Sequence, residues 1–178
     1  MKRLFIGVPV SDEVKLKAKE LIGKLKETGA DLNLVSDENL HFTLHFFGDV
    51  YEEDIKEIES KLNTLISKEK SFEISLKKLG VFPNLSRINV IWIGVEGNLL
   101  QLIEKVANLF ENKETPVAHL TVARVKSAKN KDKLQMLIKE EENANFGEMR
   151  VEKVVLYESV LSVQGSVYKV VREFELKS

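Results

Sequence analysis

Two kinds of hydrophobic pattern alternate along the chain and indicate a structure of mixed helices and strands. Short runs of apolar, β-branched and aromatic residues are typical of strands, whereas apolar residues spaced three and four apart are typical of a helix with one buried face. The expected strands span 4–8, 40–48, 72–81, 91–95 and 117–125, and the expected helices span 12–28, 55–66 and 99–110 and include 134–138. A final β-hairpin is expected from 151–163 and 167–176, which flank Gln164, Gly165 and Ser166.

The order of these elements occurs twice. The run Leu4-Phe5-Ile6-Gly7-Val8 is nearly copied in Ile91-Trp92-Ile93-Gly94-Val95, and each copy is followed by a helix, a strand and another helix. The repeat predicts an α+β fold of two lobes of about 90 residues each, related by pseudo-twofold symmetry. We expect residues 1–178 to form a single two-lobed domain.

Composition narrows the class of protein. The 178 residues are 43% hydrophobic and 31% charged, which suits a folded domain with a sizeable core. No apolar run approaches the roughly 18 residues of a membrane-spanning helix, and the short apolar stretch at 4–10 does not have the form of a signal peptide, so we expect a cytoplasmic protein. The 27 basic and 28 acidic residues give a net charge of −1, so the protein as a whole does not attract nucleic acid. Any RNA would be bound at a local site.

Cysteine is absent, which excludes disulfides, thiolate metal sites and cysteine nucleophiles. The chain has three histidines, and this number argues against a metal cluster built from histidine. We therefore expect neither a metal nor another cofactor.

Two of the three histidines lie in a repeated pattern, His-x-Thr-x, at 41–44 and 119–122. Side chains two apart share one face of a strand, so His41 should lie beside Thr43 and His119 beside Thr121. A single copy is usually accidental, but two copies at matching places of a repeat indicate a common site. Two strands facing one groove would then present a pair of imidazoles for acid–base chemistry.

This pair suits a phosphodiester. One imidazole would accept a proton from water, the other would donate a proton to the oxygen leaving phosphorus, and the threonine hydroxyls would hold the non-bridging oxygens. A 2′,3′-cyclic phosphate is especially suitable because its strained ring is opened by water without metal activation. The residues leave open which histidine is the acid and which is the base, since the pseudo-symmetry makes the two motifs nearly interchangeable.

With these motifs the chain resembles the two-histidine (2H) phosphoesterases, and specifically the LigT-like RNA 2′,3′-cyclic phosphodiesterases historically called 2′-5′ RNA ligases. The similar segments are 3–6, 41–48, 80–83, 90–95, 119–124 and 158–162, with Gly165 and Tyr168. The resemblance implies antiparallel sheets that line a central groove, with helices outside. It also implies hydrolysis of RNA 2′,3′-cyclic phosphate to a 2′-phosphate, with His41 as proton donor and His119 as acceptor. The family name further implies reversible joining of RNA ends through a 2′-5′ linkage.

Three further residues are candidates for substrate binding. Arg124 matches an arginine that the resemblance associates with phosphate, but strict alternation points it away from His119, so a bulge or strand end would be needed. Phe5 could stack on a nucleobase or belong to the core. His45 shares the face of His41 by strand parity, so it could contact phosphate or be an ordinary, partly exposed histidine. Five basic residues could also approach RNA, but solvated loop and helix-start positions are commoner for such side chains: Arg87, Lys126, Lys129, Lys131 and Lys133.

Two other functions remain open. The chain could bind RNA ends or nucleotides without turnover, or it could be a related phosphodiesterase that acts on cyclic nucleotides or 2′-5′ oligoadenylate. The expected partner is RNA with 2′,3′-cyclic phosphate ends, tRNA fragments among the candidates, and the expected state is a monomer.

Overall fold

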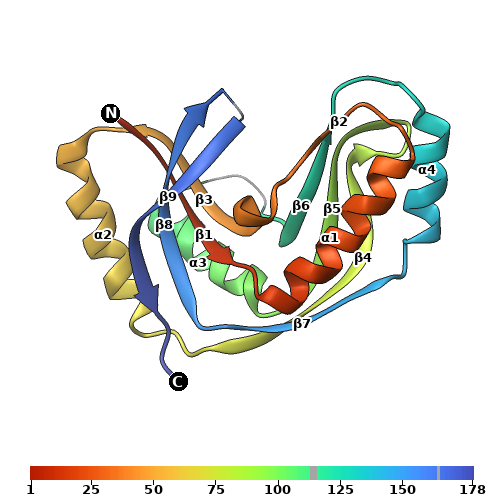
Figure 1. Cartoon of the computed structure of the whole chain (residues 1–178). Helices are drawn as coiled ribbons and strands as arrows, with labels where there is room; N and C mark the ends of the chain where they lie inside the picture. Colours follow the sequence, from red (N-terminus) through yellow and green to blue (C-terminus); the bar gives the residue numbers. More distant parts are fainter. Residues whose placement is uncertain (113–115, 164) are drawn as a thin grey trace.

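The computed structural model of the chain describes residues 1–112, 116–163 and 165–178 (Figure 1). Gln164, which was expected in the terminal turn, lies outside the described residues. The elements in chain order are β1 (Lys2–Pro9), α1 (Asp12–Glu27), β2 (Leu32–Leu34), the 3-10 helix η1 (Asp37–Asn39), β3 (His41–Val50), α2 (Glu52–Ile66), β4 (Phe72–Asn84), β5 (Arg87–Gly97), α3 (Leu99–Leu109), β6 (His119–Val125), α4 (Lys131–Glu140), β7 (Asn145–Val151), β8 (Lys153–Ser162) and β9 (Gly165–Glu175).

Every helix and strand expected from the hydrophobic pattern is present. Helix α1 begins where predicted, because the Ser11 hydroxyl accepts a hydrogen bond from the Val14 amide, and its apolar stripe is buried. The pattern missed β2, which has three residues, and β7, where a glycine with positive φ, Gly147, interrupts a short alternating run. Strands β4 and β5 are also longer than expected and form one hairpin.

The strands form one nine-stranded sheet in the order β7-β4-β5-β6-β3-β1-β8-β9, with β2 added beside β6. The strands that carry the two His-x-Thr motifs, β3 and β6, are neighbours at its centre and are joined by the pair Phe42 and Leu120. Outward from this centre, β5 corresponds to β1, β4 to β8 and β7 to β9. This order confirms the predicted two-lobed α+β fold, with a first lobe of β3, β1, β8 and β9 and a second lobe of β6, β5, β4, β7 and β2.

The two lobes are not the two halves of the sequence, as the repeat had implied. Each repeat sends its last strand to the other lobe, because β4 pairs with β5 and β8 pairs with β1. The first helices are exchanged as well: α1 packs on β7 and α4 of the second lobe, whereas α3 packs mainly on β3 of the first (Figure 1). The repeat predicts the order of elements correctly, but which sheet a helix covers is decided by packing.

The hydrophobic core lies between the sheet and the four helices on its outer side. Leu21 and Leu25 of α1, Leu62 of α2 and Leu99 of α3 are almost fully buried there. Burial of one such side chain stabilises the fold by about 1.5–3 kcal/mol. Across the described ranges, no helix has both the length and the apolarity that spanning a membrane requires.

Candidate active site

The inner side of the sheet forms a cleft between the lobes, with a cavity of about 180 Å³. This central cleft brings together the two histidines and two threonines of the motifs, together with the predicted arginine: His41, Thr43, His119, Thr121 and Arg124. The first two residues come from β3 and the other three from β6. His41 and His119, which are 78 positions apart in the sequence, therefore share one cavity.

The pairing of β3 with β6 determines how the motifs face one another. Since Phe42 lies opposite Leu120, the antiparallel register sets His41 across from Thr121 and His119 across from Thr43. The two histidines are thus diagonal neighbours, a relation that corresponds to about 7–8 Å between Cα atoms in a regular strand pair. Both imidazoles can reach one phosphate from this arrangement.

Both imidazoles are held in the same way. The Nδ1 atom lies 2.7 Å from the carbonyl oxygen two residues earlier, that of Asn39 for His41 and that of Val117 for His119. A carbonyl can only accept, so Nδ1 carries the hydrogen in each ring and the neutral tautomer has its lone pair on Nε2. The Thr43 hydroxyl lies 3.0 Å from His41 Nε2, which places a hydroxyl and a reactive nitrogen side by side.

Burial lowers the pKa of both histidines from the usual 6.5, and the carbonyl hydrogen bonds oppose this shift only in part. The pKa of His41 is lowered further by the charge of His119, and the pKa of His119 is lowered further by the charge of Arg124. Both rings are therefore neutral at pH 7 in the protein alone. The two histidines also titrate as a coupled pair, because a proton on His119 disfavours a proton on His41.

A β-bulge turns Arg124 into the cleft. Ile91 of β5 pairs with Ala123 and Trp92 pairs with Thr121, so Val122 is one extra residue in β6. Val122 and Ala123 are consequently both buried, and the alternation is reversed beyond them. The bulge that strict alternation would have required for Arg124 is present in the structure.

A matching bulge in β3 changes the face of the strand on which His45 lies. Ile6 pairs with His45 and Gly7 pairs with Thr43, which makes Leu44 the extra residue. His45 therefore leaves the face of His41 and packs against the rings of Phe47 and Phe110, with centroids 4.6 and 5.4 Å away. It borders a neighbouring hollow rather than the central cleft. Simple strand parity was wrong here because it does not allow for an extra residue.

Phe46 lies on the face of β3 where strict alternation had placed His45. The sequence pattern had not indicated Phe46 as a site residue. Phe46 stands five residues after His41, as Arg124 stands five after His119, and both line the cleft. Its side chain is 50% exposed, and the guanidinium of Arg3 lies 5.3 Å from its ring centre. Comparison of the two motifs predicts this placement, because the fifth residue after the histidine faces the cleft in both strands.

Phe5 supports the site from below. It is only 2% exposed, and its ring lies 4.8 Å from that of His41 and 5.0 Å from that of Tyr157, on which it stacks. The edge of Tyr168 completes this aromatic surround of His41, at 5.2 Å. Phe5 lines the floor of the cleft, and burial this deep favours the core interpretation of Phe5 over stacking on a nucleobase.

The second histidine has its own aromatic surround. Phe82 and Trp92 lie 5.2 and 6.2 Å from the ring of His119. Trp92 is the counterpart of Phe5 in the repeat, and it lies flat over Gly80, where any Cβ would come within 2.3 Å of the indole. These packed rings fix both imidazoles against rotation.

The described part of the chain contains no group of three or more histidine, aspartate or glutamate side chains placed to hold a metal ion. The polar side chains of the central cleft are instead imidazoles, hydroxyls, the Asn39 amide and one guanidinium. Such a set binds anions.

Two His-x-Thr strands that meet in a cleft between pseudo-symmetric lobes define a two-histidine phosphoesterase. The chain belongs to the LigT-like phosphoesterase family: the sequence model of the family described as "LigT like Phosphoesterase" matches residues 8–92 and 94–168. Each matched stretch contains one of the two motifs.

Similar proteins agree with this assignment. An RNA 2′,3′-cyclic phosphodiesterase of Methanothermobacter thermautotrophicus is 39% identical over 98% of both chains, and one of Methanocaldococcus jannaschii is 38% identical over 97% of this chain and 99% of its own. Among solved structures, TT0787 of Thermus thermophilus superposes with a TM-score of 0.85 at 26% identity, covering 98% of each chain. Escherichia coli LigT complexed with 3′-AMP has the same fold, with a TM-score of 0.76 at 20% identity over 99% of both chains.

Proposed function

We propose that this protein is a hydrolase that opens the 2′,3′-cyclic phosphate at the end of an RNA to give a 2′-phosphate. The observation that carries the proposal is the central cleft itself, where two tautomer-fixed imidazoles and Arg124 line one cavity of about 180 Å³. The names of the relatives in Methanothermobacter and Methanocaldococcus support the same reaction.

In the proposed mechanism His119 is the base and His41 is the acid. His119 Nε2 takes a proton from water as the water oxygen bonds to phosphorus, and His41 gives a proton to the 3′ oxygen as its bond to phosphorus breaks. The products are a 2′-phosphate and a 3′ hydroxyl. Thr43 and Thr121 donate hydrogen bonds to the non-bridging oxygens, and the Arg124 guanidinium holds the same phosphate.

The structure gives a reason for this direction of proton transfer that the symmetric motifs do not give. Arg124 lies on the side of His119 and lowers the pKa of that ring, which favours the neutral form that a base must have. A phosphodiester anion in the cleft would raise the pKa of both histidines, and a single proton taken up from solvent on binding would then reside on His41. The positive charge of Arg124 thus separates two otherwise equivalent histidines.

We infer that Phe46, rather than Phe5, stacks on the nucleobase next to the scissile phosphate. Phe46 is half exposed on the wall of the cleft, whereas Phe5 is buried beneath His41. Stacking on an aromatic side chain contributes about 1–3 kcal/mol per base and tolerates any base. The proposed site therefore binds the phosphate through specific polar contacts and binds the nucleobase without strong preference for its identity.

The test is turnover of a short RNA with a 2′,3′-cyclic phosphate in the presence of EDTA. Wild-type protein is expected to release the 2′-phosphate at an unchanged rate, while His41→Ala and His119→Ala are inactive. His45→Gln is the matched control, since it alters the third histidine, which lies outside the cleft. Loss of wild-type turnover in EDTA would contradict the metal-free mechanism, and full activity of either alanine variant would contradict the histidine pair.

Binding of the RNA end without turnover by wild-type protein would favour a binding module instead. Faster cleavage of 2′-5′ oligoadenylate or of a cyclic mononucleotide than of RNA would favour a related phosphodiesterase. Joining of RNA ends is proposed only as a side reaction, in which the 5′ hydroxyl of a second RNA replaces water as the nucleophile at the cyclic phosphate and the 3′ oxygen leaves. Action on tRNA fragments, the monomeric state and the cytoplasmic location stay predictions.

A further inference from the structure

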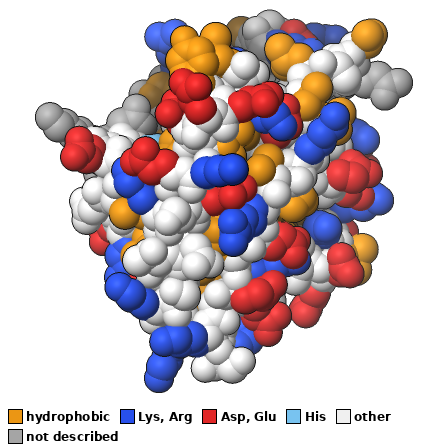
Figure 2. All heavy atoms as spheres, turned by 90° about the vertical axis from the view of Figure 1, so that its left-hand side faces the viewer, with side chains coloured by type: hydrophobic (Ala, Val, Ile, Leu, Met, Phe, Trp, Pro, Cys, Tyr) orange, Lys and Arg blue, Asp and Glu red, His pale blue; other side chains and the backbone are white. Residues whose placement is uncertain are grey.

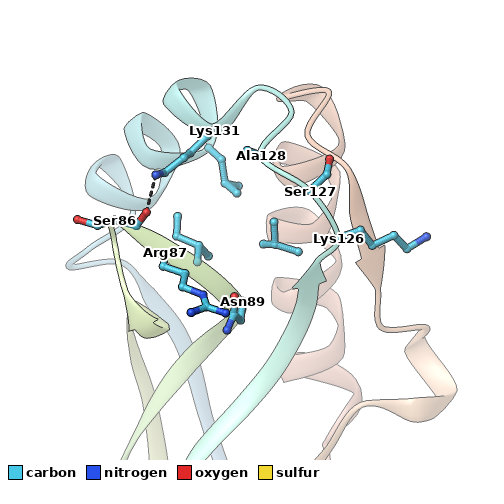
Figure 3. A pocket seen from close by; sticks show the side chains of 10 residues that line it. Ser86, Arg87, Asn89, Lys126, Ser127, Ala128 and Lys131 are labelled. Atoms are coloured by element: carbon cyan, nitrogen blue, oxygen red, sulfur yellow. Dashed lines mark hydrogen bonds between the residues drawn. The ribbon is translucent and has the colours of Figure 1, made fainter.

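A second cavity lies at the tip of the second lobe, away from the two histidines. It has a volume of about 220 Å³ and is enclosed by the turn between β4 and β5, the end of β6 and the start of α4 (Figure 3). Its floor is apolar, and its rim carries the polar groups of Ser86, Arg87, Asn89 and Lys131. We call this cavity the tip pocket.

The walls of the tip pocket are held in place by α4. The Lys131 ammonium donates a hydrogen bond to the Ser86 carbonyl oxygen, and the Gln135 amide donates one to the Leu85 carbonyl oxygen at 2.6 Å. The Asn84 side chain caps the same turn by accepting from the backbone amides of Ser86 and Arg87. A turn fixed in this way keeps the pocket open without a ligand.

Positive charge is concentrated around the tip pocket. Residues 124–133 include five basic residues and one acidic residue, although the whole chain has a net charge of −1. Some lysines in other parts of the protein are paired, as in Lys77 with Glu96 at 3.2 Å and Lys153 with Glu173 at 2.9 Å. Considering only the described residues, no carboxylate lies within salt-bridge distance of Arg87, Arg124 or Lys126.

The outer face of the first lobe is different. Lysines, arginines and carboxylates are intermixed across that face, and neither sign forms a continuous area (Figure 2). Such a surface does not attract a polyanion to one place, because opposite charges screen one another. The unpaired cations at the tip pocket therefore form a local anion-binding surface.

Strand β6 connects the tip pocket to the central cleft. It begins at His119 and ends at Val125, which corresponds to about 20 Å at 3.3 Å per residue. Arg124 lines the central cleft, and Val125 lines the tip pocket. Lys126 follows immediately and points away from Arg87, along the outside of the pocket (Figure 3). Arg124 and Lys126 thus place two cationic side chains at the end of this strand, where the cleft and the tip pocket adjoin.

We propose that the tip pocket binds the sugar–phosphate backbone of the RNA upstream of the cyclic end. The inference rests on RNA being the substrate, as proposed above. An RNA whose 3′ end lies in the cleft would follow β6, and a span of about 20 Å accommodates a few nucleotides of single strand. Arg87 and Lys131 would contact a phosphate, while the apolar floor accommodates a ribose or base.

The experiment compares two substrates, a 2′,3′-cyclic mononucleotide and an eight-nucleotide RNA with a 2′,3′-cyclic end. The variant is Arg87→Gln/Lys131→Gln, which removes two charges and keeps amide groups that can hold the Ser86 carbonyl. The control is Lys56→Gln/Lys68→Gln, which removes the same charge from the other lobe, on and just beyond α2. Affinity for an RNA that ends in a 2′-phosphate is measured in parallel at several salt concentrations.

For Arg87→Gln/Lys131→Gln we expect KM for the RNA to rise about tenfold with kcat unchanged, whereas the mononucleotide should be cleaved as by wild type. The salt dependence of RNA binding should weaken by the equivalent of one to two phosphates. Control and wild type should coincide. Equal RNA affinity and KM in the pocket variant, the control and wild type would overturn the tip pocket proposal.

Failure of the proposed reaction is distinguishable from failure of the pocket. If wild type cleaves neither substrate, the proposed function is wrong, and the binding measurement alone still decides the pocket: selective loss of RNA affinity in Arg87→Gln/Lys131→Gln supports it, and unchanged affinity refutes it. If wild type cleaves both substrates and the variant loses efficiency on both alike, the residues act through the fold and the pocket proposal is refuted.

Discussion

Strands β3 and β6 carry the same motif and the same bulge, but beyond the bulge they present different side chains to the cleft. Each has a histidine, a threonine two residues later and one extra buried residue, Leu44 in β3 and Val122 in β6. At the fifth position after the histidine, β3 then has Phe46 and β6 has Arg124. The backbone of the site is symmetric, and its chemistry is made asymmetric by this one pair of positions.

The strongest test of that asymmetry is to remove each histidine in turn. His41→Ala and His119→Ala should each lower kcat on a cyclic phosphate by about a thousandfold, the range of one acid or base group. A nucleotide phosphodiester with a nitrophenolate leaving group needs no acid, so His41→Ala should recover much of the rate on it and His119→Ala should not. Steady-state rates on both substrates provide the measurement. Equal recovery by both variants would show that the roles are not divided as proposed.

Arg124 tests the charged side of the pair. Arg124→Met should lower kcat/KM by about a hundredfold, since a charge-assisted contact with the phosphate is lost. It should also raise the pKa of His119, because the neighbouring positive charge that lowers it is gone. A base works only when neutral, so the acid limb of the kcat/KM profile should move to higher pH. Arg124→Lys serves as control and should keep the limb near its wild-type position. A shift to lower pH in Arg124→Met would contradict the electrostatic assignment.

Phe46 is the apolar member of the pair, and its substitution is expected to change the kinetic constants least. Phe46→Ala should raise KM for a cyclic purine nucleotide about tenfold, as expected from the loss of one stacked base, with kcat little changed. Phe46→Trp should keep the wild-type KM, because the indole provides a comparable flat surface. The values come from initial rates over a range of substrate concentrations. A KM for Phe46→Ala equal to that of wild type would show that the base lies elsewhere.

The sequence was sufficient for the features that depend on regular periods. A period of two places Thr43 beside His41, and the duplicated pattern brings His41 and His119 to one cleft, as the structure shows. The bulges at Leu44 and Val122 leave no such pattern, because both residues are apolar whether paired or extra. One extra residue reverses every later side chain in the strand, and for that reason Phe46 was missed and His45 was misplaced.

The exchange of elements between lobes was also beyond the sequence. The apolar stripe of α1 predicts that one face of the helix is buried, but it does not predict that this face packs on β7, which is more than a hundred residues away. Strand β7 itself contains few apolar residues in an uninterrupted run and depends on its pairing with β4. Long-range packing of this kind is determined by the whole chain.

That exchange has a consequence for the origin of the protein. A half-length ancestor with the elements of one repeat would have had no sheet of its own for its first helix or its last strand. It would have been stable only as a symmetric dimer, with each copy giving those two elements to its twin and one histidine to a site on the twofold axis. Fusion of two copies then freed the halves to diverge, and an arginine on one side and a phenylalanine on the other are what divergence left at that axis.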